Sequence, residues 1–339
     1  MAATAGATAQ ATATMQAVVQ TRYGSADVLQ VEQIERPSIG DHEVLVRVHA
    51  AGLDRGTWHL LSGQPYLVRL GFGLRRPRNP VPGLDVAGTV VATGSAVTKF
   101  AVGDEVFGLS KGSFAEYACA REDLLAHKPA SLPFAQAAAL GVSALTALKG
   151  VRDTGQVQAG QRVLIVGASG GVGTFAVQLA KALGAEVTGV CSTAKCDLVR
   201  SIGADHVIDY TLDDFAAAPQ RYDVIIDIGG NSSLSRLRRA LTPRGTLVMV
   251  GGENGGRVTG GFDRMLRGLA LSPFVRQQLR VVGAKQRGSD LKHLAELATA
   301  GDVASVIDSR YPLEQAADAM RHLVSGRARG KVVITVIAA

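Results

Sequence analysis

The sequence predicts an α/β protein of two domains, an irregular β-barrel followed by a doubly wound parallel sheet. The first half is rich in short β-type runs that Gly and Pro interrupt. From about residue 139, strand patterns alternate with helix patterns, which is typical of parallel strands joined by right-handed helical crossovers. A glycine-rich turn joins the first strand of this half to the following helix. A chain of 339 residues is long enough to bury a separate core in each domain.

The composition places the domain boundaries. Residues 1–14 are almost wholly Ala, Thr and Gly and are expected to form a disordered tail. We assign residues 15–138 to the β-rich domain and residues 139–284 to the parallel-sheet domain, and we expect residues 285–339 to return to the first domain. Examples of the strands expected in the first domain are 15–21, 44–50, 86–91 and 115–118.

In the second half, short apolar runs bounded by turn residues mark the buried strands of a parallel sheet. The expected strands are 162–166, 186–191, 206–209, 223–228, 246–250 and 279–282. Helices are expected at 290–300 and 313–325. A last strand at 331–336 follows too late to belong to the parallel sheet, so we expect it to pair in the first domain.

The glycine-rich turn is the strongest functional signal in the chain. Its spacing Ala168-x-Gly170-x-x-Gly173 lies between a strand and a helix, as in dinucleotide-binding sites. Gly170 would let the backbone approach a pyrophosphate, and Gly173 would let the helix pack closely on the strand. The free N–H groups of the helix N-terminus would then face the phosphates. The predicted contact residues are Ala168, Ser169, Gly170, Gly171, Val172 and Gly173.

The end of the second parallel strand indicates which nicotinamide cofactor is bound. Sites that prefer NAD place a carboxylate there for the ribose hydroxyls, but this chain has no acidic residue between Val190 and Asp197. Ser192 and Lys195 instead offer a hydroxyl and a cation, which suit a 2′-phosphate. Alternatively, Ser192 caps the next helix and Lys195 is solvated. We predict NADP(H) as the cofactor.

Charge and composition exclude several classes of protein. The net charge of +7 is accompanied by no nucleic-acid-binding motif, so we expect no nucleic acid as a partner. No apolar run is long enough for a membrane span without an interrupting Gly, Pro or charge. The three cysteines form no CxxC pair, which is typical of a reduced, cytoplasmic protein. The 1–14 segment lacks the basic and apolar regions of a secretory signal.

Seven segments of the chain have an order and spacing that are together very specific. They are 82–88 (PGLDVAG), 102–108 (VGDEVFG), 112–117 (GSFAEY), 168–173 (ASGGVG), 183–185 (LGA), 202–210 (IGADHVIDY) and 330–334 (GKVVI). With these segments, the chain from residue 15 onward resembles the medium-chain dehydrogenase/reductase superfamily. It is closest to the zinc-independent quinone oxidoreductase-like branch, which overlaps with NAD(P)-dependent alcohol dehydrogenase-like proteins. The resemblance implies a GroES-like β-barrel catalytic domain, a Rossmann domain and a cofactor cleft between them.

The resemblance also implies further cofactor contacts. Tyr210 and Lys195 match positions that line the 2′-phosphate, and Thr146 matches the position beside the nicotinamide ring. Lys331 matches a basic residue that reaches the cofactor phosphates from the C-terminal segment. The glycines at two strand ends near the nicotinamide ribose are Gly229 and Gly251. Relatives often pair through an edge strand, here within 261–282, so a homodimer is expected.

The chain departs from the zinc alcohol dehydrogenases at all three catalytic ligand positions. Asp54, Leu84 and a residue near Val142 stand where those enzymes have Cys, His and Cys. The four-Cys structural zinc lobe is absent too, because no cysteine precedes Cys119. We therefore predict no metal ligands.

Without a Lewis acid to stabilise an alkoxide, hydride delivery to an electron-poor acceptor is the easier reaction. We predict a zinc-independent NADPH-dependent oxidoreductase that transfers hydride to a quinone or an α,β-unsaturated carbonyl, with a small-molecule electron acceptor as partner. Two alternatives stay open: an aldehyde or alcohol reductase, and a non-catalytic structural or RNA-touching relative that keeps the cofactor site.

The predicted catalytic residues are Asp54, Trp58 and Tyr66. Tyr66 could donate a proton or hydrogen bond to a carbonyl oxygen, although Tyr66 and Trp58 could equally pack as pocket walls. Asp54 donates a hydrogen bond only when protonated. His59 is interpreted as structural. The glycine-rich 252–273 segment could be a mobile cover or a solvated connection.

Overall fold

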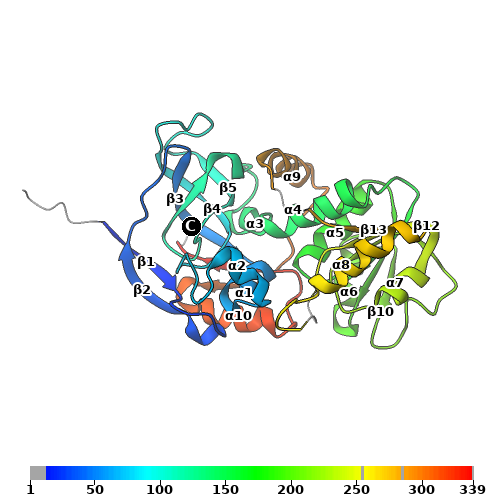
Figure 1. Cartoon of the computed structure of the whole chain (residues 1–339). Helices are drawn as coiled ribbons and strands as arrows, with labels where there is room; N and C mark the ends of the chain where they lie inside the picture. The colour runs from blue at the N-terminus through cyan, green and yellow to red at the C-terminus, as the bar shows by residue number, and fades with distance from the viewer. Residues whose placement is uncertain (1–12, 253–255, 284–285, 338–339) are drawn as a thin grey trace, which may run out of the picture.

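The computed structural model describes residues 13–252, 256–283 and 286–337. Two domains lie side by side, with the N-terminal strands in one and the green-to-yellow helices and strands in the other (Figure 1). Residues 1–12 of the predicted tail lie outside the described residues. Thr14 already belongs to β1 (Thr14–Val19), which pairs antiparallel with β2 (Gln30–Glu35). The last residue of the predicted tail is therefore the first residue of a strand.

The second domain contains a six-stranded sheet in which every pairing is parallel. The strand order is β10-β9-β8-β11-β12-β13, so the direction of winding reverses between β8 and β11. This confirms the predicted doubly wound sheet. Its strands are β8 (Arg162–Val166), β9 (Glu186–Cys191), β10 (His206–Asp209), β11 (Tyr222–Asp227), β12 (Leu241–Met249) and β13 (Gln278–Val281).

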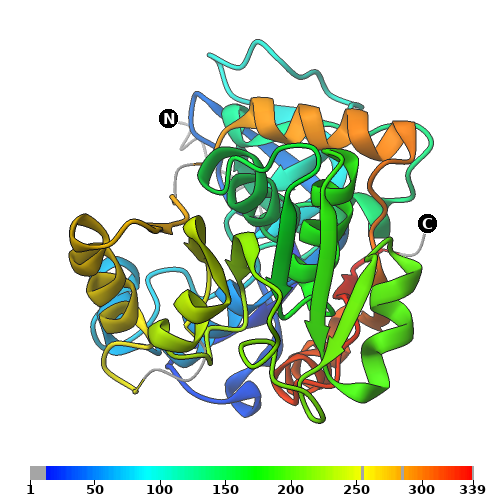
Figure 2. The same ribbon diagram turned by 90° about the vertical axis from the view of Figure 1, so that its right-hand side faces the viewer.

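Both faces of this sheet are covered. Along β8, Val163 and Ile165 join one core cluster and Leu164 joins another, because alternate side chains point to opposite faces. Figure 2 shows α9 running across one end of the sheet. The helices that surround the sheet are α4 (Val142–Leu148), α5 (Gly171–Ala182), α6 (Cys196–Ser201), α7 (Leu234–Ala240), α8 (Phe262–Leu271) and α9 (Gly288–Ala300). The short helix α3 (Phe134–Ala139) packs instead on the sheet of the first domain.

The first domain is built on a seven-stranded sheet rather than a closed barrel. Its main path is β14-β15-β3-β4-β5-β7, and within the described residues no pairing joins the two ends. The central strand β3 is long enough for two partners on one edge: β6 pairs with its first half and β15 with its second. The strands are β3 (Glu43–Leu53), β4 (Asp85–Thr93), β5 (Glu105–Leu109), β6 (Tyr117–Arg121), β7 (Leu125–His127), β14 (Ile307–Pro312) and β15 (Lys331–Thr335).

The C-terminal segment completes this first domain, as the orange and red ribbon among the blue strands shows (Figure 1). β15 pairs antiparallel with β3, and α10 (Ala316–Val324) buries Ala319 and Met320 in the same core as Val46 and Val48. A strand far along the chain therefore finishes a sheet begun near its start. β13 is left at one edge of the parallel sheet, where the predicted homodimer would pair; that pairing stays a prediction.

Candidate functional site

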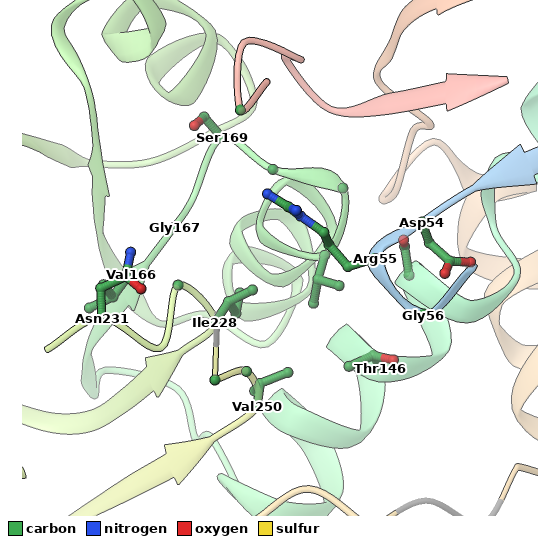
Figure 3. Close-up of a pocket in the computed structure, with 18 of the residues that line it drawn as sticks. Asp54, Arg55, Gly56, Thr146, Val166, Gly167, Ser169, Ile228, Asn231 and Val250 are labelled. Carbon is green, nitrogen blue, oxygen red and sulfur yellow. The ribbon is translucent and has the colours of Figure 1, made fainter. Parts of the chain in front are cut away.

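A cavity of about 990 Å³ opens at the carboxyl ends of the parallel strands, where the two domains meet. Its walls include the ends of β8, β9, β11, β12 and β13, so it lies across the point at which the strand order reverses. This is the place where open α/β sheets bind ligands. Figure 3 shows Val166, Gly167 and Ile228 on the sheet side and Asp54, Gly56 and Thr146 on the other.

The glycine-rich turn forms the middle of the cavity wall. Ser169, Gly170, Gly171 and Val172 line the cavity, so the N-terminus of α5 opens onto it. A helix N-terminus presents unpaired N–H groups and a positive dipole end, which suit a phosphate. The C-terminal segment touches the same turn, because the Gly330 N–H donates to the carbonyl of Ser169 at 2.9 Å.

Ala168 and Gly173 have a structural role instead. Ala168 is fully buried, and its N–H donates to the Val190 carbonyl at 3.0 Å. A Cβ on Gly173 would lie 2.1 Å from the carbonyl oxygen of Gly167, which is far inside van der Waals contact. Only glycine permits this close approach of α5 to the strand end.

The three residues predicted to bind the 2′-phosphate line one part of the same cavity, which we call the 2′-phosphate corner. These residues are Ser192, Lys195 and Tyr210, at the ends of β9 and β10. The Lys195 ammonium donates to the backbone carbonyls of Gly326 (2.7 Å) and Ala328 (2.8 Å), so it also holds the C-terminal segment against this corner. Burial lowers the pKa of Lys195. An ammonium has three protons, so one is left for a ligand once both carbonyls are satisfied.

The strand-end glycines are fixed by a buried ion pair. Gly229 and Gly251 line the cavity. Beneath them, Arg264 of α8 donates to Asp227 at 2.5 Å and to the Gly251 carbonyl at 2.9 Å. Asp227 also accepts the Gly230 N–H at 3.2 Å. Burial raises the pKa of Asp227, while Arg264 opposes that rise.

The cavity wall opposite the sheet ends carries the polar side chains Asp54 and Thr146. Asp54 caps α1 (Arg55–Ser62) by accepting the Thr57 N–H on Oδ1 at 2.8 Å. Its Oδ2 is buried and has no hydrogen-bond partner among the described residues. Thr146 lines the cavity from α4 and donates its hydroxyl to the Val142 carbonyl at 2.7 Å.

His59 and Arg55 also line this wall, although sequence analysis did not assign either to the site. His59 Nδ1 lies 2.7 Å from the Gln64 carbonyl, so Nδ1 carries a proton and Nε2 is left for other contacts. The Arg55 guanidinium reaches into the cavity (Figure 3). The helical spacing of Arg55 and His59 behind Asp54 was the available signal, because i and i+4 share one face of a helix.

Two residues predicted to be catalytic lie outside the cavity lining. Trp58 packs against the core of the first domain, on the other face of α1. Tyr66 is 41% exposed, and its ring stacks with the Arg69 guanidinium at 4.6 Å. Only its neighbours in sequence, Pro65 and Val68, face the cavity. Neither aromatic side chain is therefore placed to contact a ligand there.

Lys331 is also placed differently from the expectation that it reaches the cofactor phosphates. Its side chain is 1% exposed, and its ammonium contacts Asp85 Oδ2 at 3.0 Å and Ser143 Oγ at 3.1 Å. Asp85 Oδ1 accepts the Val142 N–H at 2.6 Å. Burial raises the pKa of Asp85 to about 7, although Lys331 opposes the rise. This buried cluster links β4, β15 and α4. In this part of the chain, Gly330 lines the cavity and Lys331 does not.

Family models match two parts of the chain: the alcohol dehydrogenase GroES-like domain at residues 40–130 and the zinc-binding dehydrogenase at 202–334. The chain is 35% identical to the 2-methylene-furan-3-one reductase of Solanum lycopersicum, over 94% of this chain and 79% of that protein. It is also 35% identical to the chloroplastic NADPH-dependent alkenal/one oxidoreductase of Arabidopsis thaliana, over the same shares of the two chains.

The solved structure of the quinone oxidoreductase from Coxiella burnetii superposes with a TM-score of 0.82 and 27% identity, covering 96% of this chain and all of that one. In the part of the chain that the structure describes, no helix is both long and apolar enough to cross a membrane. The two reductases that are 35% identical to this chain over most of their length are similar enough to assign the chain to their family. The chain belongs to the medium-chain dehydrogenase/reductase superfamily, in its quinone oxidoreductase-like branch, and is an oxidoreductase.

Proposed function

We propose that this protein is an NADPH-dependent reductase that transfers hydride to a quinone or an α,β-unsaturated carbonyl without a catalytic metal. The observation that carries the proposal is the glycine-lined cavity at the strand-order reversal, with Ser192, Lys195 and Tyr210 at one end and the Asp54 wall at the other. Relatives named for reduction of an alkenal or enone, and a structural neighbour named as a quinone oxidoreductase, support the choice of acceptor.

In this proposal a dinucleotide lies along the cavity. Ser169, Gly170 and the N-terminus of α5 would hold the pyrophosphate, and Arg55 provides a cation on the facing wall. Gly229, Gly251 and Thr146 would surround the nicotinamide half. When bound, the reduced cofactor supplies a hydride; the protein's own groups must orient the acceptor and manage the proton.

Ser192, Lys195 and Tyr210 would select the 2′-phosphate of NADP. A hydroxyl, a phenol and the remaining ammonium proton are donors, and none of the three brings a carboxylate that would repel the phosphate. Mutating Lys195→Glu should therefore weaken NADPH binding by at least tenfold more than NADH binding, because a charge-assisted bond is replaced by repulsion. Arg200→Glu makes the same charge change on α6 outside the cavity and is the control. An equal loss of affinity for both cofactors would show that Lys195 does not contact the 2′-phosphate.

The donor set of the first-domain wall does not fit a catalytic zinc. Leu84 and Val142 carry no ligand atom, and Asp54 uses Oδ1 to cap α1. No cluster of three or more His, Cys, Asp or Glu side chains that could hold a metal is found in the described part of the chain. Polarisation of the acceptor oxygen must then come from hydrogen-bond donors.

His59 is the titratable donor that we assign to this task. With Nδ1 fixed on the Gln64 carbonyl, the protonated ring can donate from Nε2 to a carbonyl oxygen that gains charge as hydride arrives. The proton then moves from the imidazolium to the reduced acceptor and is replaced from solvent.

Cofactor oxidation by chelator-treated protein tests the proposal. NADPH and NADH are compared across 1,4-benzoquinone, 9,10-phenanthrenequinone, an enone, an enal and a simple aldehyde. We expect turnover with NADPH on a quinone or enone, unchanged by the chelator. Turnover with aldehydes alone, or only after zinc is added, would favour the alcohol dehydrogenase alternative and refute the metal-free reaction.

A further inference from the structure

Two of the three cysteines of the chain meet at the adenosine end of the cavity. Cys191 ends β9 and Cys196 begins α6, and their Sγ atoms are 3.8 Å apart. Cys191 lines the cavity. The residues between the two cysteines form a single turn, which contains Ser192 and Lys195.

We propose that Cys191 and Cys196 are an oxidisable dithiol, which hydroperoxides convert to a disulfide across the turn that selects the cofactor. The effect on cofactor choice rests on the proposed function, whereas the oxidation itself does not. A disulfide needs the two sulfurs at about 2.05 Å, so each must move inward by roughly 1 Å. Both are free thiols in the structure.

Exposure assigns different roles to the two sulfurs. Cys191 donates its S–H to Cys196, and Cys196 donates its own S–H to the Ser192 carbonyl at 3.7 Å. Cys196 is only partly buried, so a hydroperoxide can reach its sulfur, whereas Cys191 is buried. Cys191 is 2% exposed, and burial together with the bond to Cys196 raises its pKa to about 12. Cys196 is thus the attacking thiolate, and Cys191 is the resolving thiol.

The chemistry proceeds in two steps. The Cys196 thiolate attacks the distal oxygen of a hydroperoxide, the O–O bond breaks, and the products are a Cys196 sulfenic acid and an alcohol. The Cys191 sulfur then attacks the Cys196 sulfur and displaces hydroxide, which leaves as water with the Cys191 proton. Two thiols and one hydroperoxide give one disulfide, one alcohol and one water.

The disulfide would change the 2′-phosphate corner because both of its ends flank that turn. Pulling Cys196 toward the end of β9 shifts the backbone of the turn that carries Ser192 and Lys195. Lys195 is also held by Gly326 and Ala328, so it cannot follow the turn without breaking those bonds. We expect the Kd for NADPH to rise about tenfold and that for NADH to change little, because only NADPH carries the 2′-phosphate.

The test uses full-length protein in a Cys119→Ser background, which removes the remaining thiol while leaving the cavity intact. Cys119 lies in β6 of the first domain, where it donates to the Ser38 carbonyl. Treatment with tert-butyl hydroperoxide should remove two hydrogen atoms from the intact mass, join the Cys191 and Cys196 peptides, and be reversed by dithiothreitol. Kd values for both cofactors are measured before and after oxidation.

Single variants then test the roles of the two thiols. In Cys191→Ser, hydroperoxide should leave a sulfenic acid on Cys196 that dimedone traps. In Cys196→Ser, Cys191 should stay reduced under the same conditions. Separate alkylation of both cysteines after oxidation, or trapping on Cys191 instead, would overturn the dithiol proposal. A disulfide that forms without changing the NADPH-to-NADH ratio would overturn its effect on cofactor choice. If the reduced protein bound NADPH no more tightly than NADH, the cofactor assignment would be refuted. The disulfide measured by intact mass would still support the dithiol.

Discussion

Substituting alanine at two glycines of the same turn should separate cofactor binding from folding. A Cβ on Gly170 would lie 3.7 Å from the Gly167 carbonyl oxygen, which is ordinary contact, and the backbone of Gly170 (φ −86°, ψ 177°) is open to any residue. A Cβ on Gly173 would lie 2.1 Å from the same oxygen, roughly 0.9 Å inside the 3.0 Å limit that real contacts respect. Alanine therefore fits the free protein at Gly170 and clashes with backbone at Gly173.

The magnitudes follow from these contacts. Gly173→Ala forces α5 away from the end of β8, and overpacking of this kind costs about 3 kcal/mol. For a chain of this size, the midpoint of thermal unfolding should fall by about 4 °C. Gly170→Ala should leave the midpoint within about 1 °C. It should still weaken NADPH by about 2 kcal/mol, or roughly thirtyfold in Kd, because the methyl group occupies the surface that the pyrophosphate must approach.

Differential scanning calorimetry and fluorescence titration with NADPH measure the two effects independently. Native affinity in Gly170→Ala would show that the pyrophosphate does not cross this turn, and the proposed binding site would then be wrong. Native stability in Gly173→Ala would refute the close-packing argument.

The remaining predictions concern buried charge and proton delivery. Asp85→Asn or Lys331→Met alone should lower the free energy of unfolding in urea by about 3–5 kcal/mol, whereas the double variant should recover most of that loss, because neither charge is then buried alone. His59→Gln should lower kcat for an enone at least tenfold with little change in KM, and a native kcat across the pH profile would exclude His59 as the proton donor. Arg264→Met should destabilise the protein by about 3 kcal/mol and weaken NADPH, whereas Arg264→Lys should restore part of both. Tyr66→Phe should leave turnover unchanged, because its ring packs on Arg69 outside the cavity; a loss of turnover would return Tyr66 to the active site.

The sequence predicted the parallel sheet well because its central strands β8, β9 and β11 are buried on both faces. β8, β9 and β10 have the predicted limits, since a continuous apolar run ends at a glycine or polar turn. The first domain was harder to predict. Its strands β5 and β7 are short and were missed, and the open path of its sheet depends on which strands share the edges of β3, which local patterns do not encode.

The candidate site was predictable where a role depends on backbone geometry. The turn around Gly170 lines the cavity, as its spacing indicated. Side-chain roles were harder, because they depend on partners far away in sequence. Nothing near Lys331 in the sequence shows that its ammonium will pair with Asp85. Nothing near Trp58 shows which face of α1 is buried. His59 was passed over because a single histidine without a partner at metal spacing gives no signal of its own.

The buried ion pair between Asp85 and Lys331 has a consequence for the order in which this protein matures during synthesis. Domains generally fold as they emerge from the ribosome, beginning with the N-terminal one. Here Asp85 emerges early, but its partner stands close to the end of the chain, in the strand that completes the sheet around β3. Until that strand arrives, the carboxylate has no buried cation and β3 has an uncovered edge. The parallel-sheet domain, whose strands end at Val281, can form in the meantime. The domain that is made first is therefore finished last, and a chain that terminates before Lys331 would leave the early domain open to aggregation.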